Sequence, residues 1–220
     1  MAVLISRRYC WKLKSIMEQF KYGQVEIEHL KRRDKKLGVA IDRIGAIERE
    51  VTPDLFTALV KSIVAQQIST RAADTVWGRL CAQLADITPE SIAAAGVSEI
   101  QKCGLSMRKA GYIKGLGNAA ICGELDLVGL GVLSDDEIVK KLLSLRGLGV
   151  WTAEMIMIFS LCRPDVVSWG DLAIRRGMMN LYGLKKLSKE QFERYRKRYS
   201  PYGSVASLYL WALSVQQSHN

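Results

Sequence analysis

The chain has 220 residues, of which 49 % are hydrophobic and 25 % charged, a balance typical of a globular protein and not of a disordered one. It has no run of 18 apolar residues and no recognisable cleavable signal, so we expect neither a membrane protein nor a secreted one. The net charge of +10 favours a polyanionic partner.

The cysteines are odd in number and widely spaced, and they form no Cys-x-x-Cys pair. This favours reduced thiols in a cytosolic setting over disulfides. Two histidines are too few for an ordinary zinc site. We therefore expect no cofactor. The residues concerned are Cys10, Cys81, Cys103, Cys122, Cys162, His29 and His219.

Helix-start signals recur along the chain and precede apolar residues at helical spacing. Two of them are a capping residue followed by proline, which suits the first helical position, and another is a capping box. Nothing alternates with a period of two, and residues 121–132 are interpreted as a loop. The predicted fold class is all-α, with about ten helices. The signals are Thr52-Pro53-Asp54, Ser69, Thr88-Pro89-Glu90 and the Ser188–Gln191 box.

Residues 145–153 read Leu-Arg-Gly-Leu-Gly-Val-Trp-Thr-Ala and join two predicted helices. The first helix begins after a Ser134 cap and carries acidic residues in its first turn, which stabilise a helix start. Gly147 and Gly149 let the chain turn tightly and leave bare N–H groups where the second helix begins, near Val150. Such a helix terminus binds anions, and a DNA phosphate is a suitable one. Taken alone, the pattern also fits a plain turn between helices.

This segment resembles the helix-hairpin-helix signature at every defined position. With the acidic residue that follows in Trp169-Gly170-Asp171-Leu172, the chain is similar over about residues 35–215 to the helix-hairpin-helix DNA glycosylase superfamily. Its nearest branch is the alkylated-purine (3-methyladenine) glycosylases. The resemblance implies two helical subdomains flanking a DNA-binding cleft. These are a middle bundle of residues 53–165, with the motif at about 134–163, and a second subdomain of residues 1–52 plus 166–220.

The resemblance assigns the chemistry to Asp171. Glycosidic cleavage develops positive charge on the deoxyribose, and a fixed carboxylate stabilises that charge and orients or activates a water. The residue would also make a good helix N-cap, and the two roles are compatible. Bifunctional members place a nucleophilic lysine two residues after the second hairpin glycine. Here that position is Trp151, so we expect no lyase activity.

Three side chains are expected in the pocket for the flipped base. The aromatic face of Trp151 suits a positively charged alkylated purine. Trp211 aligns with a second pocket tryptophan of the alkylpurine branch, and Met155 stands where some relatives have an aromatic ring. As the alternative, tryptophans in an all-α protein are most often core residues.

The resemblance also implies residues that contact DNA. Gln67, with Ile68 beside it, aligns with the residue that fills the gap left by the flipped nucleotide. Alternatively, Gln66 and Gln67 only cap helix ends. Residues 103–110 look like a degenerate hairpin that could contact the DNA backbone, although a plain turn fits equally well. The other expected DNA contacts are Gly147, Leu148, Gly149, Thr152 and Arg108.

The family's hairpin binds a structural Na⁺ or K⁺ through backbone carbonyls. The corresponding carbonyls are those of Leu143, Leu145 and Leu148. Carbonyl ligands leave no trace in a sequence, so this site rests on the resemblance alone.

The expected activity is hydrolysis of the N-glycosidic bond of alkylated purines, 3-methyladenine and 7-methylguanine, in duplex DNA. The partner is double-stranded DNA that contains damaged bases, with no membrane association and a monomeric protein. The location would be cytoplasmic, at the nucleoid, or nuclear in a eukaryote. Two alternatives remain open: a non-catalytic helix-hairpin-helix DNA-binding module, and a glycosylase for deaminated or oxidised bases.

Overall fold

The computed structural model describes residues 18–215, so Cys10 and His219 lie outside it. This described part contains twelve α-helices, one short 3-10 helix and no β-strand, which confirms the all-α prediction with two helices more than expected. An isolated antiparallel bridge joins Gln19 and Glu50. The helices are α1 (Gln24–Arg33), α2 (Lys35–Ile44), α3 (Leu55–Ala65), α4 (Thr70–Leu84), α5 (Pro89–Ala94), α6 (Val97–Lys102), α7 (Met107–Ile121), η2 (Gly129–Val132), α8 (Asp135–Leu143), α9 (Val150–Phe159), α10 (Leu172–Tyr182), α11 (Lys189–Tyr199) and α12 (Gly203–Val215).

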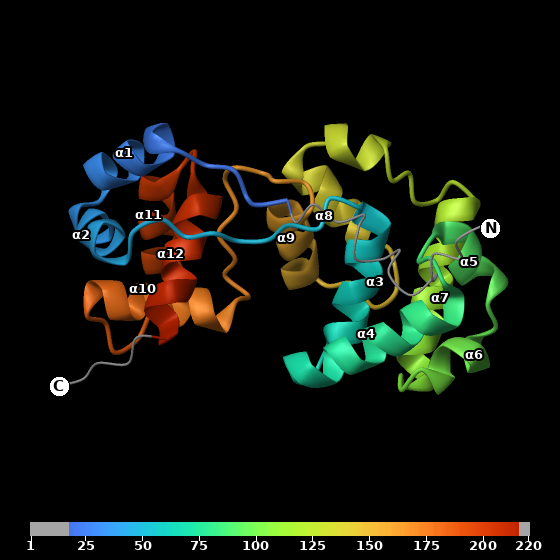
Figure 1. The fold of residues 1–220 in the computed structure, drawn as a ribbon. Coiled ribbons are helices and arrows are strands. Elements are labelled where there is room, and N and C mark those ends of the chain that lie inside the picture. The colour runs from blue at the N-terminus through green and yellow to red at the C-terminus, as the bar shows by residue number, and fades with distance from the viewer. Residues whose placement is uncertain (1–17, 216–220) are drawn as a thin grey trace, which may run out of the picture.

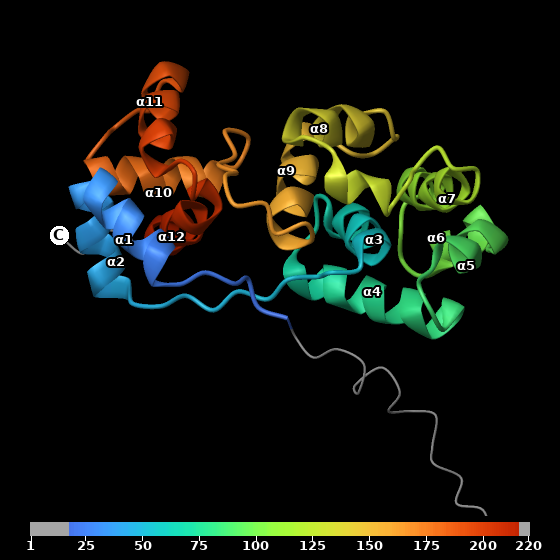
Figure 2. The ribbon, with the colours of Figure 1, turned by 90° about the horizontal axis from the view of Figure 1, so that it is seen from above.

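The helices form two lobes (Figure 1). One lobe holds α1 and α2 together with α10, α11 and α12, and the other holds α3 to α9. Figure 2 shows the extended segments that connect them, residues 45–54 and residues 160–171. One continuous core cluster spans both lobes, so the subdomain boundary at residues 53–165 stays a prediction. Within residues 18–215, no helix is both long and apolar enough to cross a membrane.

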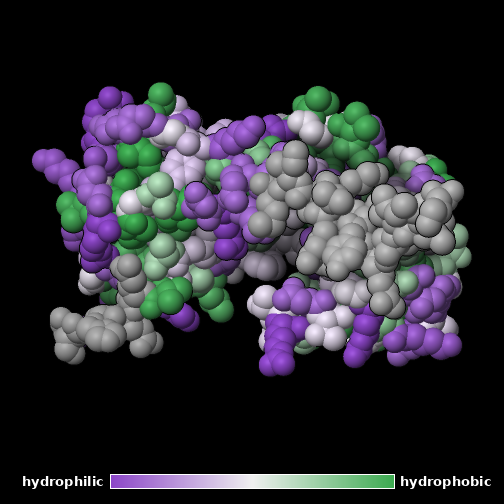
Figure 3. All heavy atoms as spheres, in the orientation of Figure 1, coloured by the Kyte–Doolittle hydropathy of each residue, from purple (hydrophilic) through white to green (hydrophobic). Residues whose placement is uncertain are grey.

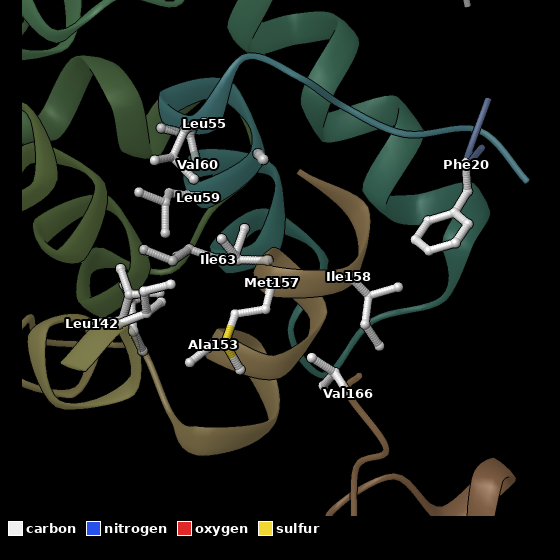
Figure 4. Close-up of a cluster of buried hydrophobic side chains, with 14 of the residues drawn as sticks. Phe20, Leu55, Leu59, Val60, Ile63, Leu142, Ala153, Met157, Ile158 and Val166 are labelled. Carbon is white, nitrogen blue, oxygen red and sulfur yellow. The ribbon is translucent and has the colours of Figure 1, made fainter. Parts of the chain in front are cut away.

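The core beneath the site lies between α3 and α9 (Figure 4). Leu59 and Ile63 of α3 face Ala153 and Met157 of α9, and all four side chains are buried. Burial of such side chains contributes about 1.5–3 kcal/mol each for the larger ones. This packing fixes α9, which follows the hairpin, against α3, which precedes the predicted wedge residue Gln67. The two DNA-binding elements are therefore built on one rigid base.

Helix caps account for most of the agreement between sequence and structure. The hydroxyls of Ser69, Thr88, Ser134 and Ser188 all accept hydrogen bonds from the backbone three residues later, as predicted. The prediction at residues 52–54 was wrong in its register.

The cap of α3 is Asp54, which accepts from the Thr57 N–H at 2.7 Å. Pro53 therefore precedes the helix and does not begin it. The Thr52 N–H instead donates to the Phe159 carbonyl at 2.8 Å. Thr52 therefore bonds to α9 and does not cap α3, which begins after Asp54.

Close packing of α10 and α12 holds the second lobe together. A Cβ atom at Gly177 would overlap the backbone carbonyl of Leu210, so this crossing requires glycine. The N-terminal end of α10 points toward the α3–α9 lobe (Figure 1). Figure 3 shows the surface notched between the lobes at the bottom of that view. The residue that begins α10 therefore stands where the two lobes meet.

Candidate active site and DNA-binding hairpin

The hairpin between α8 and α9 leaves a helix N-terminus uncovered. Gly147 has a φ of +91°, and a Cβ atom there would overlap the Tyr112 ring, so glycine is required on both grounds. Gly149 caps α9 with an extended φ of −115° and makes no side-chain cap hydrogen bond. A Cβ atom at Gly149 would meet nothing within 4 Å. Only the first glycine thus makes the turn, and the second keeps open the space in front of the α9 N–H groups.

The other hairpin residues predicted to touch DNA are less exposed. Leu148 is 8 % exposed and Thr152 is 4 % exposed, so contact with a phosphate would come through their backbone N–H groups. Arg108 lies exposed in the first turn of α7.

A side chain that the sequence did not single out for this role ties the wedge segment to the hairpin. The Gln66 amide donates to the Gly147 carbonyl at 2.7 Å. The alternative role for Gln66 was helix capping, and the observed bond instead joins two segments far apart in the chain. Lys109 of α7 donates to the Val64 carbonyl at 2.9 Å and also to the Gln66 carbonyl. Burial and the neighbouring Arg108 lower the pKa of Lys109. Lys109 therefore supports the end of α3 and is not free to bind DNA.

The predicted wedge stands in an unusual backbone conformation. Gln67 has a φ of +58°, in the left-handed region that costs most residues about 1–2 kcal/mol. Its side chain is exposed, and Ile68 is 40 % exposed beside it. Strain of this kind clusters at functional sites, because the surrounding structure must hold it in place. Here the Gln66 and Lys109 hydrogen bonds hold the neighbouring residue.

Asp171 is a buried carboxylate, 8 % exposed, at the N-terminus of α10. Its Oδ1 accepts from the N–H groups of Ala173 and Ile174 at 2.8 and 2.9 Å, so the predicted cap is present. Its Oδ2 accepts from the indole Nε1–H of Trp151 at 2.9 Å. The two residues that sequence reasoning treated separately, on different helices, are thus joined directly. Within the described residues, no cation forms an ion pair with this carboxylate.

A cavity of about 510 Å³ opens beside Trp151, and Asp171 adjoins it through its hydrogen bond to Trp151 without lining it. Its size suits a small-molecule or base-sized ligand. It brings together four residues from the predicted site, and its lining contains no acidic side chain. The lining is Arg49, Thr52, Ala58, Lys61, Ser62, Ala65, Gln66, Gln67, Trp151, Thr152, Met155, Ile156, Phe159 and Ser160.

Trp211 is the predicted pocket residue that does not line this cavity. Its ring lies 5.4 Å from that of Phe159, which does line it. Trp211 therefore packs against a residue of the cavity wall. A pocket role for its own ring stays a prediction.

The geometry agrees with the comparison to known proteins. The family described as HhH-GPD superfamily base excision DNA repair protein matches residues 60–201, which include the wedge segment, the hairpin and Asp171. The chain belongs to this superfamily.

Individual relatives point to one branch of the superfamily. The chain is 30 % identical over 164 residues to DNA-3-methyladenine glycosylase 1 of Schizosaccharomyces pombe, covering 72 % of each protein. The crystal structure of a DNA-3-methyladenine glycosidase from Bacillus halodurans matches at 33 % identity and a TM-score of 0.83, over 91 % of this chain and 94 % of that one. A 3-methyladenine DNA glycosylase of Schizosaccharomyces pombe in complex with abasic DNA matches at 27 % identity and a TM-score of 0.75, over 86 % and 95 %.

The position of the superfamily's lyase lysine is filled here by Trp151, whose indole N–H contacts Asp171. An indole has no amine that could attack the sugar. Trp151 is also 45 % exposed and lines the cavity. The same side chain therefore positions the carboxylate and forms part of the cavity wall.

Two other carboxyl groups near the site have structural roles. Asp165 accepts from the Gly203 N–H at 3.0 Å and from the Ser200 hydroxyl, so it joins the segment before α10 to the start of α12. Glu154, which the sequence did not single out, lies on α9 and accepts from the Ser168 hydroxyl. Burial raises the pKa of Glu154, and the nearby Asp171 adds to this effect.

The carbonyls of Leu143, Leu145 and Leu148 lie in and after the last turn of α8, where helix carbonyls lack helical partners. The Leu145 carbonyl accepts from the Leu148 N–H at 3.3 Å and retains a second lone pair. Neutral oxygen donors suit a monovalent cation, so these residues fit the superfamily's hairpin ion. Its binding here stays a prediction.

Proposed function

We propose that this protein is a monofunctional DNA glycosylase that removes alkylated purines, 3-methyladenine and 7-methylguanine, from duplex DNA. The observation that carries the proposal is the Asp171–Trp151 pair beside a base-sized cavity, next to an anion-binding hairpin. The names of the relatives support the substrate class. In this scheme the protein acts as a monomer on damaged double-stranded DNA.

Binding would begin at the hairpin. The bare N–H groups of α9 would hold a phosphate, and the net charge of +10 would attract the duplex. A hairpin ion at Leu143, Leu145 and Leu148 would add positive charge facing that phosphate. Gln67 would then enter the gap left by the flipped nucleotide, held in its strained conformation by the contacts of Gln66.

In the chemical step the bond between the deoxyribose C1′ and the purine nitrogen breaks, and the base leaves with the electron pair. Positive charge develops on the sugar, and the buried Asp171 carboxylate stabilises it. Water then attacks C1′, and its proton passes to the Asp171 carboxylate and from there to solvent. Trp151 orients the Oδ2 atom through its indole N–H, and its ring face would attract the cationic base.

The test is base release from methylated duplex DNA, followed by strand analysis before and after hot alkali. We expect free 3-methyladenine and 7-methylguanine, with strand breaks only after alkali. Breaks before alkali, or trapping of the protein on DNA by borohydride, would show a lyase and refute the monofunctional assignment. Release of only deaminated or oxidised bases would show that alkylated purines are not the substrates.

A non-catalytic DNA clamp is the second candidate, because the hairpin by itself is a sequence-independent phosphate site. It is favoured if wild type and Asp171→Asn bind DNA equally and neither releases any base. The buried carboxylate argues against it. A clamp gains nothing from a negative charge beside a polyanion, whereas a developing sugar cation requires one.

A further inference from the structure

The cavity has polar groups at one end that the proposed chemistry does not use. Its α9 N-terminal end holds Trp151, which contacts the reacting carboxylate. Its other end, where α9 finishes, holds Ser160 and Arg49, both among the lining residues. The intervening wall is apolar, with Met155 and Ile156 on α9. A base whose sugar lies at Asp171 would therefore extend its far edge toward Arg49 and Ser160.

Ser160 carries a buried hydroxyl that lacks a hydrogen-bond partner among the described residues. Such groups are uncommon, since an unsatisfied buried hydroxyl is unfavourable. Ser62, in the same cavity, shows the ordinary arrangement, because its hydroxyl donates to the Leu59 carbonyl at 2.7 Å. Because Ser160 is among the lining residues, a ligand in the cavity would supply the missing partner.

Arg49 provides a second group without a polar partner. Its guanidinium carbon lies 5.2 Å from the centre of the Phe159 ring, and no acid pairs with it among residues 18–215. The backbone around it is fixed, because the Phe20 N–H donates to the Arg49 carbonyl at 2.7 Å. The Thr52 N–H, three residues on, bonds to Phe159 at 2.8 Å. The backbone of Arg49 is thus fixed beside the cavity, and its guanidinium lies over Phe159 with no acidic partner among the described residues.

Lys61 is the other cation of the lining, and its geometry differs. Its ammonium lies 5.1 Å from the centre of the Trp77 ring on α4. The charge therefore lies against a residue that does not line this cavity. Lys61 and Ser62 serve as matched controls for Arg49 and Ser160.

We propose that Arg49 and Ser160 recognise the 6-carbonyl oxygen of the flipped purine, so that the cavity selects 6-oxopurines over 6-aminopurines. This rests on the proposed glycosylase function. A guanidinium donates to a carbonyl oxygen, as in the common pairing of arginine with guanine O6. A 6-amino group presents N–H donors at that position, so an arginine N–H directed there finds no acceptor. The charge of the base does not decide between them, because 7-methylguanine and 3-methyladenine are both cationic in the nucleotide.

The experiment measures both bases released from one methylated DNA sample, as the ratio of initial rates for 7-methylguanine and 3-methyladenine. This ratio does not depend on the fraction of folded enzyme or on DNA affinity. Arg49→Gln and Ser160→Ala should each lower the ratio about tenfold, since each loses a discriminating hydrogen bond. Lys61→Gln and Ser62→Ala should leave it within about twofold.

An unchanged ratio in Arg49→Gln and Ser160→Ala overturns the inference. Equal loss of both products in Arg49→Gln also overturns it, because Arg49 would then act as a phosphate contact. If Lys61→Gln and Ser62→Ala changed the ratio as much, the cause would be cavity shape, and the inference would be refuted. Failure of wild type to release either base would refute the proposed function itself, and the inference with it.

Discussion

The N-termini of α2 and α10 are each capped by a buried aspartate, and the two sites differ in what their second oxygen meets. Asp34 caps α2 by accepting from the Leu37 N–H at 3.0 Å, and its Oδ2 meets Arg198 at 3.0 Å. The Tyr182 hydroxyl donates to the same oxygen at 2.6 Å. Asp171 caps α10 through Oδ1, and its Oδ2 meets only the neutral indole of Trp151. The cap is common to both, and the countercharge is not.

This difference separates a structural carboxylate from one that can act on a ligand. The Arg198 guanidinium neutralises Asp34, so its charge contributes to holding α1, α2 and α11 together. Asp171 has no such cation among the described residues, so its charge remains available to a developing cation at the cavity. A buried charge without a partner is unfavourable for folding, and functional sites accept that cost. Replacing each aspartate by asparagine should therefore lower activity at Asp171 and stability at Asp34.

The largest effect is expected for Asp171→Asn. Asparagine is also a good N-cap, so α10 should keep its start while the negative charge is lost. Single-turnover base release should fall about 100- to 1,000-fold, the usual cost of removing one transition-state contact. DNA affinity and thermal stability should change little. Release within a few-fold of wild type would show that another group carries the chemistry.

The matched change Asp34→Asn should act on stability alone. It leaves Arg198 without its countercharge and weakens the bond from Tyr182, whose pKa burial raises, so this tyrosine remains a neutral donor. We expect a loss of about 2 kcal/mol in the free energy of unfolding. The melting temperature should then fall by roughly 4–8 °C for a chain of this length.

Base release per folded Asp34→Asn molecule, titrated by active-site counting at a temperature where the variant is folded, should equal wild type. A loss of activity without a loss of stability would contradict the contrast between the two caps.

A smaller effect should follow from Trp151→Phe, which keeps an aromatic face and removes the N–H donated to Asp171. Release of both alkylated bases should fall about tenfold, corresponding to one hydrogen bond to a charged group. Trp77→Phe is the matched control, because that ring lies on α4 and does not line the cavity. It should stay within about twofold of wild type. Equal losses in both variants would assign the effect to packing.

Local features of this fold were predictable and the contacts that assemble the site were not. Ser134 and Ser188 cap helices because each bonds to its own next turn. The Thr52 prediction failed, since its N–H pairs with Phe159, more than a hundred residues away. Asp171 and Trp151 were both identified, but their hydrogen bond depends on how α9 and α10 meet, which no local pattern encodes.

Gln66 illustrates the same limit. Its amide bonds to Gly147 across the interface of α3 and the hairpin. The sequence analysis predicted a DNA contact for its neighbour, Gln67, and only a capping role for Gln66. Polar side chains that join distant segments have no periodicity, so they emerge only from the packed structure.

The smallest predicted effect concerns Glu154, a half-buried carboxyl group whose stability contribution depends on pH. Burial raises its pKa above the ordinary 4.5, so the folded state holds a proton more tightly than the unfolded state. This contribution to stability is fully present below pH 4.5 and is lost as the pH rises through the raised pKa. At neutral pH the buried charge is therefore unfavourable, and Glu154→Gln, which can still accept from Ser168, should melt about 1–2 °C higher than wild type. Melting curves recorded from pH 7 down to pH 4.5 should show this difference in melting temperature shrink.

A Glu154→Gln variant that melts lower than wild type at pH 7 would contradict this. It would mean that a cation compensates Glu154, as one does Asp34, and Arg196 is the nearby candidate.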